Sequence, residues 1–87
     1  MSVLWTHHAV LALEKRNLAA DDIVAILLLP DWIVPDTKDA TLSRAFGKTP
    51  FVNQWIRVVF RKINKDDILV ITVHPDRDAK LPNLGND

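Results

Sequence analysis

Arginine, threonine and histidine side chains recur at alternate positions near the end of the chain. Residues 51–63 and 68–74 alternate as two antiparallel strands do, with a turn signal at residues 64–67 between them. If the two strands pair, alternation places four polar side chains on one face: Arg57, Arg61, Thr72 and His74. An arginine binds phosphate through two parallel hydrogen bonds, and a histidine can transfer a proton near neutral pH. These residue types indicate phosphodiester chemistry, although an exposed sheet face without a special role would show the same spacing.

Cleavage of RNA at its own 2′-hydroxyl needs groups of these kinds and no metal. A base takes the proton of the 2′-hydroxyl, cations stabilise the pentavalent phosphorane, and an acid protonates the leaving oxygen. The chain has no Cys, which excludes disulfides and thiolate nucleophiles, and its two Gly exclude a glycine-rich phosphate loop. We therefore expect chemistry that depends on no cofactor.

The adjacent pair His7 and His8 does not predict a metal site. Neighbouring residues of a helix point about 100° apart, so the pair cannot act as two ligands on one helix face. A zinc site would also need His74 and a carboxylate, and the sequence shows no pattern that brings them together. We expect one of the two histidines to pack or cap the helix and the other to be solvated.

The three tryptophans are expected to have different roles. Trp55 shares the predicted strand face with Arg57, so its ring is placed to stack on a nucleobase. Trp5 and Trp32 are expected in the core, because large aromatic side chains dominate small cores.

The charges are balanced in total and segregated along the chain. The 87 residues carry 11 Lys and Arg and 11 Asp and Glu, so the net charge is zero. Residues 1–43, 44–65 and 66–87 carry −3, +6 and −3. A block of one sign can create a local field in a neutral molecule, so the balanced total does not exclude an anionic partner. The same block is also compatible with a solvated strand surface.

Two helices are predicted in the first half of the chain. Residues 6–16 have helical periodicity, with Thr6 as N-cap and Asn17 suited to the left-handed position that ends a helix. Residues 20–29 form a second apolar helix that Pro30 ends, and the short connection predicts a tight helical hairpin. A DNA-binding helix-turn-helix is disfavoured, because Asp21 and Asp22 stand where a recognition helix would meet phosphates.

The remaining residues predict a sheet. Strands are expected at residues 32–34, 41–46, 51–63 and 68–74, and residues 3–5 are either a short strand or a lead-in. The predicted fold is α+β: an N-terminal helical hairpin packed on a three- to four-stranded antiparallel sheet. Residues 1–75 form one domain and residues 76–87 a flexible tail. No apolar run is long enough to span a membrane and no secretory signal follows Met1, so a cytoplasmic protein is expected.

Two parts of the sequence resemble a family of small uncharacterised prokaryotic domains that begin with a His-Ala pair. The stretches that match its helical half are Thr6-His7-His8-Ala9, Glu14-Lys15-Arg16-Asn17-Leu18, Asp21-Asp22-Ile23 and Pro30. The stretches that match its second half are Trp55-Ile56-Arg57-Val58-Val59-Phe60 and Leu69-Val70-Ile71-Thr72-Val73-His74-Pro75. The order of helices and sheet is similar to that of BrnT-type toxins of the RelE/ParE superfamily.

This resemblance implies a ribonuclease-like fold whose concave sheet face binds RNA and is often covered by an antitoxin or immunity protein. It also implies that His8 is the leading histidine, Arg16 the arginine that ends the helix, Arg57 a phosphate-binding residue and His74 a general acid or base. Two features differ: Ala12 replaces a second helical arginine, and the chain lacks the positive charge usual in RelE-type toxins.

Two functions therefore remain as hypotheses. The first is a metal-independent endoribonuclease toxin of a toxin–antitoxin system, acting on RNA that is free or on the ribosome. Its candidate catalytic residues are Arg57, His74 and His8. The candidate residues for contacts with RNA are Arg44, Lys48, Arg61, Arg16 and Trp55. The alternative is a non-catalytic interaction module on the same fold, such as a ParE-like inhibitor of a protein target.

Overall fold

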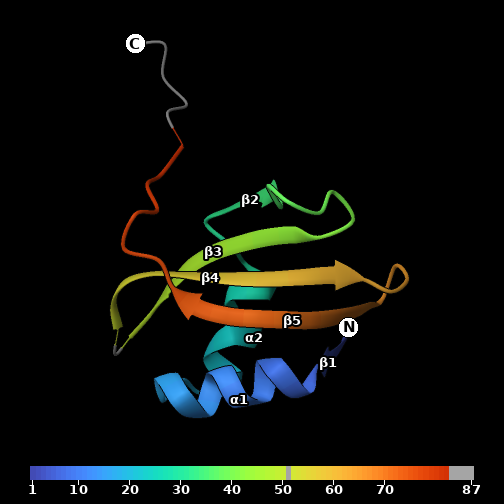
Figure 1. The fold of residues 1–87 in the computed structure, drawn as a ribbon, viewed down its shortest axis with the longest axis horizontal. Coiled ribbons are helices and arrows are strands. Elements are labelled where there is room, and N and C mark those ends of the chain that lie inside the picture. Colours follow the sequence, from blue (N-terminus) through green and yellow to red (C-terminus); the bar gives the residue numbers. More distant parts are fainter. Residues whose placement is uncertain (51, 83–87) are drawn as a thin grey trace.

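The computed structural model, which describes residues 1–50 and 52–82, has two helices packed against one five-stranded sheet (Figure 1). The elements are β1 (Ser2–Trp5), α1 (His7–Arg16), α2 (Ala20–Leu28), β2 (Trp32–Pro35), β3 (Ser43–Thr49), β4 (Val52–Lys62) and β5 (Asp67–Pro75). The strand order across the sheet is β1-β5-β4-β3-β2. No helix of the described residues is long and apolar enough to cross a membrane.

The α+β class is confirmed, and the sheet is larger than predicted. Strands β2 to β5 form the expected antiparallel run, and β1 adds a fifth strand that pairs in parallel with β5. The β1 pairing joins the first strand of the chain to the last, so no local pattern in the sequence predicts it. Residue 51, the predicted first residue of the long strand, lies outside the described residues.

The predicted tight helical hairpin is wrong in its packing, although the ends of the first helix are confirmed and α2 ends at Leu28, one residue before the predicted end. Helix α1 packs mainly on β5 and α2 mainly on β3, so each helix is stabilised by the sheet rather than by the other helix. Thr6 caps α1 by accepting a hydrogen bond from the Ala9 amide at 3.0 Å, and Asn17 ends it in the left-handed conformation (φ 54°, ψ 47°).

The core fills the space between the helices and one face of the sheet. Its buried members are Ala9, Ile23, Ile26, Leu27, Ala45, Ile56, Val58, Phe60, Ile68, Val70 and Val73. Helix α2 approaches the sheet closely at Gly47, where an added Cβ would lie 2.9 Å from the side chain of Ile26.

A β-bulge in β5 changes which side chains face the core. Val59 pairs with Thr72 and Phe60 pairs with Val70, so Ile71 is the extra residue. The bulge reverses the alternation along β5, and Val70 therefore faces the core on the opposite side of the sheet from Thr72. Simple alternation along the strand, which would put Val70 on the same face as Thr72, fails for this reason. Within the described residues, no helix covers the second face of the sheet, which carries Arg57, Thr72 and His74, and we call it the open face (Figure 1).

Candidate active site on the open face

An arginine and a histidine form a direct pair at the centre of the open face. Arg57 and His74 are register partners on β4 and β5, as the alternation predicts. Arg57 Nε donates to His74 Nε2 at 2.9 Å, and Arg57 Nη2 contacts the same nitrogen. Because Nε2 accepts these N–H groups, the imidazole is neutral and carries its proton on Nδ1.

The surroundings of His74 favour this neutral form. Burial lowers the pKa of His74 below its usual value of 6.5, and the positive charges of Arg57 and Arg16 lower it further. The carboxylate of Asp76 acts in the opposite direction without reversing the shift. His74 is therefore an unprotonated base at neutral pH.

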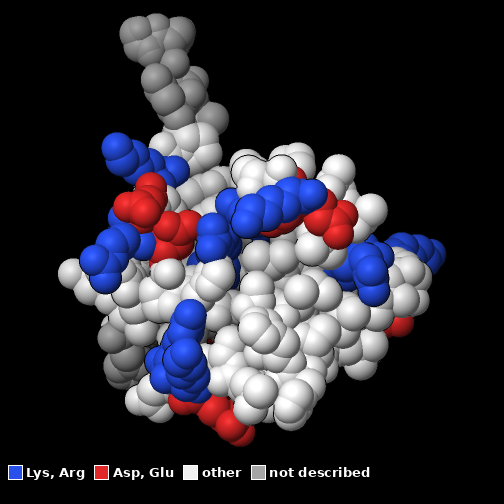
Figure 2. Space-filling view, in the orientation of Figure 1, with Lys and Arg blue, Asp and Glu red and all other residues white. Residues whose placement is uncertain are grey.

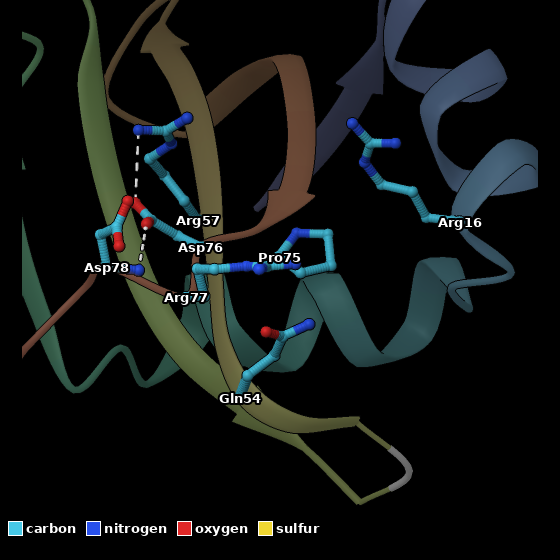
Figure 3. A pocket seen from close by; sticks show the side chains of 7 residues that line it. All are labelled: Arg16, Gln54, Arg57, Pro75, Asp76, Arg77 and Asp78. Atoms are coloured by element: carbon cyan, nitrogen blue, oxygen red, sulfur yellow. Dashed lines mark hydrogen bonds and ion pairs between the residues drawn. The ribbon is translucent and has the colours of Figure 1, made fainter.

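Asp76 holds the other side of the arginine (Figure 3). Its carboxylate Oδ2 lies 3.3 Å from Arg57 Nη1, and its backbone N–H donates to the Trp55 carbonyl oxygen at 2.8 Å. The Asp78 amide also donates to the Asp76 carboxylate, which closes a turn directly after β5. The guanidinium is thus fixed by contacts with His74 and Asp76.

Asp76 was missed as a site residue, because residues 76–87 read as a loose tail. Within that segment, residues 76–79 form this hydrogen-bonded turn and residues 83–87 lie outside the described residues. The available signal was the position of Asp76, immediately after the strand that carries His74.

Two cavities share Arg16 as a common wall. The first, of about 430 Å³, is lined by Arg16 from α1, Arg57 and Gln54 from β4, and the turn at Asp76 (Figure 3). Arg16 and Arg57 reach it from opposite sides. The second cavity, of about 390 Å³, is lined by His8 and other α1 side chains and by Thr72 and His74 of β5. The fold therefore places His8, Arg16, Arg57 and His74 around two neighbouring cavities.

The other predicted cations lie outside this group. Arg44 Nε forms an ion pair with Asp36 Oδ1 at 2.8 Å, and this hydrogen bond lowers the pKa of Asp36 to about 2. Arg61 is exposed four residues further along β4 than Arg57, a distance of about 13 Å. Lys48 is exposed, and its Nζ lies 4.5 Å from the centre of the Trp55 ring.

Three aromatic side chains cluster on the open face beside the arginine and histidine. Trp32 stacks on Phe46 with ring centres 4.6 Å apart, and Trp55 contacts Trp32 edge to face at 4.9 Å. Trp32 thus belongs to this second cluster and not to the core between helices and sheet, where it was expected. Trp5 packs against the core as expected.

Metal ligation has no support in the geometry of the described residues. Among them, no three His, Asp or Glu side chains are arranged to hold an ion. His7 and His8 are both exposed in the first turn of α1, and Thr6 is the cap, so the expectation that one histidine packs or caps the helix is wrong. The arrangement can bind an anion between Arg16 and Arg57 and can accept a proton at His74.

Comparison with solved structures finds the same fold in another protein. The Brucella abortus ribonuclease toxin BrnT, solved as a crystal structure at 1.1 Å resolution, superposes with a TM-score of 0.66. The match covers 87% of this chain and 96% of that chain at 19% sequence identity, which shows a shared fold. No match is found among curated proteins. A family model described as a domain of unknown function, DUF4258, matches residues 5–75. Because this match spans most of the chain, the protein belongs to the DUF4258 family.

Proposed function

We propose that the protein is a metal-independent endoribonuclease toxin that cuts single-stranded RNA on its open face. The observation that carries the proposal is the Arg57–His74 pair, a fixed guanidinium in contact with a neutral imidazole. Arg16 and His8 complete the region by lining the two cavities on either side. The fold supports the proposal, since it is shared with a protein named as a ribonuclease toxin.

The proposed reaction begins with binding of a backbone phosphate between Arg16 and Arg57. The guanidinium of Arg57 then turns its N–H groups from His74 to the phosphate, which leaves the Nε2 lone pair free. His74 takes the proton of the 2′-hydroxyl, and the 2′-oxygen forms a bond to phosphorus. The two arginines stabilise the charge of the phosphorane.

The leaving group needs a proton when the bond from phosphorus to the 5′-oxygen breaks. His8 lines the same cavity as His74, and in its protonated form it can supply that proton. The products are a 2′,3′-cyclic phosphate and a 5′-hydroxyl. Because every proton has a donor and an acceptor in the chain, the reaction needs no metal.

We further infer a cognate antitoxin as partner and a place in the RelE/ParE superfamily. An antitoxin that covers the open face would block both cavities at once. Arg16, Arg57 and the neighbouring Trp32–Trp55 pair would give such a partner charged and aromatic side chains to contact.

The test is cleavage of an RNA oligonucleotide by purified protein in the presence of a metal chelator. Arg57→Ala and His74→Ala should each lower the cleavage rate by about 100-fold or more, because each removes a group that acts on the reacting atoms. Lys65→Ala is the matched control: it removes one positive charge from the exposed turn between β4 and β5. Circular dichroism of each variant verifies the fold.

Two results would contradict the proposal. One is a wild-type protein that leaves RNA intact in vitro and causes no growth arrest on induced expression. The other is a cleaved RNA whose ends carry 3′-hydroxyl and 5′-phosphate groups, since the mechanism through the 2′-hydroxyl cannot form them.

A further inference from the structure

The half-buried Trp55 on the open face stands two residues before the proposed phosphate-binding arginine on the same strand. Trp55 and Arg57 are alternate residues of β4, so their side chains share a face and their Cα atoms lie about 7 Å apart. A nucleotide that places its phosphate at Arg57 can therefore reach the Trp55 ring with its own base or with the neighbouring one.

We propose that Trp55 is a stacking platform for the nucleobase next to the cleaved phosphate. This inference rests on the proposed function, because it assumes that the anion bound at Arg57 is an RNA phosphate. Aromatic rings bind unpaired bases by stacking, and they do so with little choice between bases. The platform assigns unpaired RNA as the substrate, since a base within a duplex cannot leave its stack to reach the ring.

Trp55 has one neighbour that fixes its ring, Trp32, and one that can move away from it, Lys48. Trp32 contacts the ring, and Trp32 is in turn stacked on the buried ring of Phe46, so the platform is rigid before any ligand binds. The remaining contact is the ammonium of Lys48, which lies over the ring. Lys48 is exposed on a flexible stem, and a cation–π contact at such a site is weak.

Lys48 can therefore change partners when a base binds. When a base stacks on Trp55, the ammonium can move from the ring to a phosphate of the same strand. Its positive charge then gains an anionic partner. The exchange explains why the chain has a lysine beside the ring and an arginine two residues beyond it.

The backbone ties the platform to the phosphate site. The Trp55 carbonyl accepts the Asp76 amide at 2.8 Å, and the Asp76 carboxylate pairs with Arg57. The positions of Trp55 and Arg57 are therefore set by the same turn, which fixes the spacing between base and phosphate.

Binding measurements with two probes of equal charge separate the contribution of the base to affinity from that of the phosphate. The first probe is a single-stranded 2′-O-methyl RNA oligonucleotide, which cannot be cleaved, and the second is inorganic polyphosphate. At one salt concentration, Trp55→Leu should weaken RNA binding about tenfold or more and leave polyphosphate binding unchanged. Trp55→Phe, which keeps an aromatic ring, should retain most of the RNA affinity. Arg57→Ala should weaken binding of both probes.

A fluorescence measurement keeps the test decisive if Trp55→Leu fails to fold. The double variant Trp5→Phe/Trp32→Phe leaves Trp55 as the one tryptophan, and RNA should quench its emission while polyphosphate should not. Equal affinity of the wild type for the two probes, or RNA binding without quenching, would overturn the platform.

The two proposals fail in different ways. If a folded Trp55→Leu protein cuts RNA with unchanged KM, the platform is wrong and the nuclease stands. If Trp55 is quenched by RNA but the wild type leaves cleavable RNA intact, the platform stands and the nuclease is wrong.

Discussion

At the residue scale, Arg57 and His74 each restrict what the other can do. While Arg57 donates to Nε2, His74 cannot accept a proton there, and while Arg57 contacts His74 and Asp76, fewer of its N–H groups are free for phosphate. Binding of a phosphate oxygen relieves both restrictions, because the guanidinium exchanges one acceptor for another. In the proposed mechanism, the pair would therefore couple phosphate binding to release of the Nε2 lone pair of His74.

The charges around His74 predict how its titration responds to substitution. Asp76 raises the pKa of His74, so Asp76→Asn should lower it further below 6.5, and Arg57→Gln should raise it, because a positive charge is lost. Nuclear magnetic resonance titration of the imidazole measures both. Since the base must be neutral, the acid limb of the cleavage rate should move to lower pH in Asp76→Asn. A shift to higher pH in that variant would contradict the proposed role of His74, and Lys65→Ala should change neither quantity.

At the scale of elements, the parts of the fold that local rules govern could be predicted from the sequence. Thr6 and Asn17 mark the ends of α1 because capping and the left-handed position depend on neighbouring residues. The pairing of β1 with β5 joins opposite ends of the chain, so it leaves no local trace. The bulge at Ile71 is equally invisible, because β5 is apolar on both faces up to that residue.

The residues of the candidate site likewise fall into those that the sequence could predict and those that it could not. Alternation along two neighbouring strands predicted that Arg57 and His74 share a face, while their direct pairing depends on the bulge as well. The partner of Arg57 at Asp76 and the partner of Arg44 at Asp36 come from turns and loops, whose side-chain directions no periodicity reports. Sequence reasoning therefore found the cations and missed the acids that hold them.

Thr6 joins the two elements that carry the site, and this makes it a test of their coupling. Its Oγ1 accepts from the Ala9 amide and donates to the Ile71 carbonyl at 2.9 Å, which links α1 to the bulge of β5. Thr6→Ala should lower the free energy of unfolding by about 1 kcal/mol, measured by urea denaturation. It should also slow RNA cleavage, because α1 carries His8 and Arg16. Thr6→Ser keeps the hydroxyl and should preserve both properties; equal losses in the two variants would show that the hydroxyl is not responsible.

At the scale of the whole molecule, acidic residues from both flanking segments of the sequence lie beside arginines of its basic middle segment. Two of the six cations in residues 44–65 form ion pairs with acids from outside that block, at Asp36 and Asp76. Figure 2 shows the result: Lys and Arg side chains lie in separate patches, several of them directly beside Asp or Glu. The positive block of the sequence is therefore not one continuous positive surface, and only part of its charge is available to an anion.

This distribution predicts a shallow salt dependence of RNA binding. Three cations surround the proposed path of the strand: Arg16, Lys48 and Arg57. Each phosphate contact with a single strand contributes about −0.7 to the slope of log K against log salt, so the slope should be about −2. Arg16→Ala should make it shallower by about 0.7.

Arg44→Ala provides the matched control, since Asp36 already neutralises that charge and the slope should not change. Fluorescence anisotropy of the 2′-O-methyl RNA over a range of KCl concentrations measures each slope. A slope of about −4 would require about six phosphate contacts, twice the expected number. That result would contradict the restriction of the strand to Arg16, Lys48 and Arg57, because other cations would then contact phosphate as well.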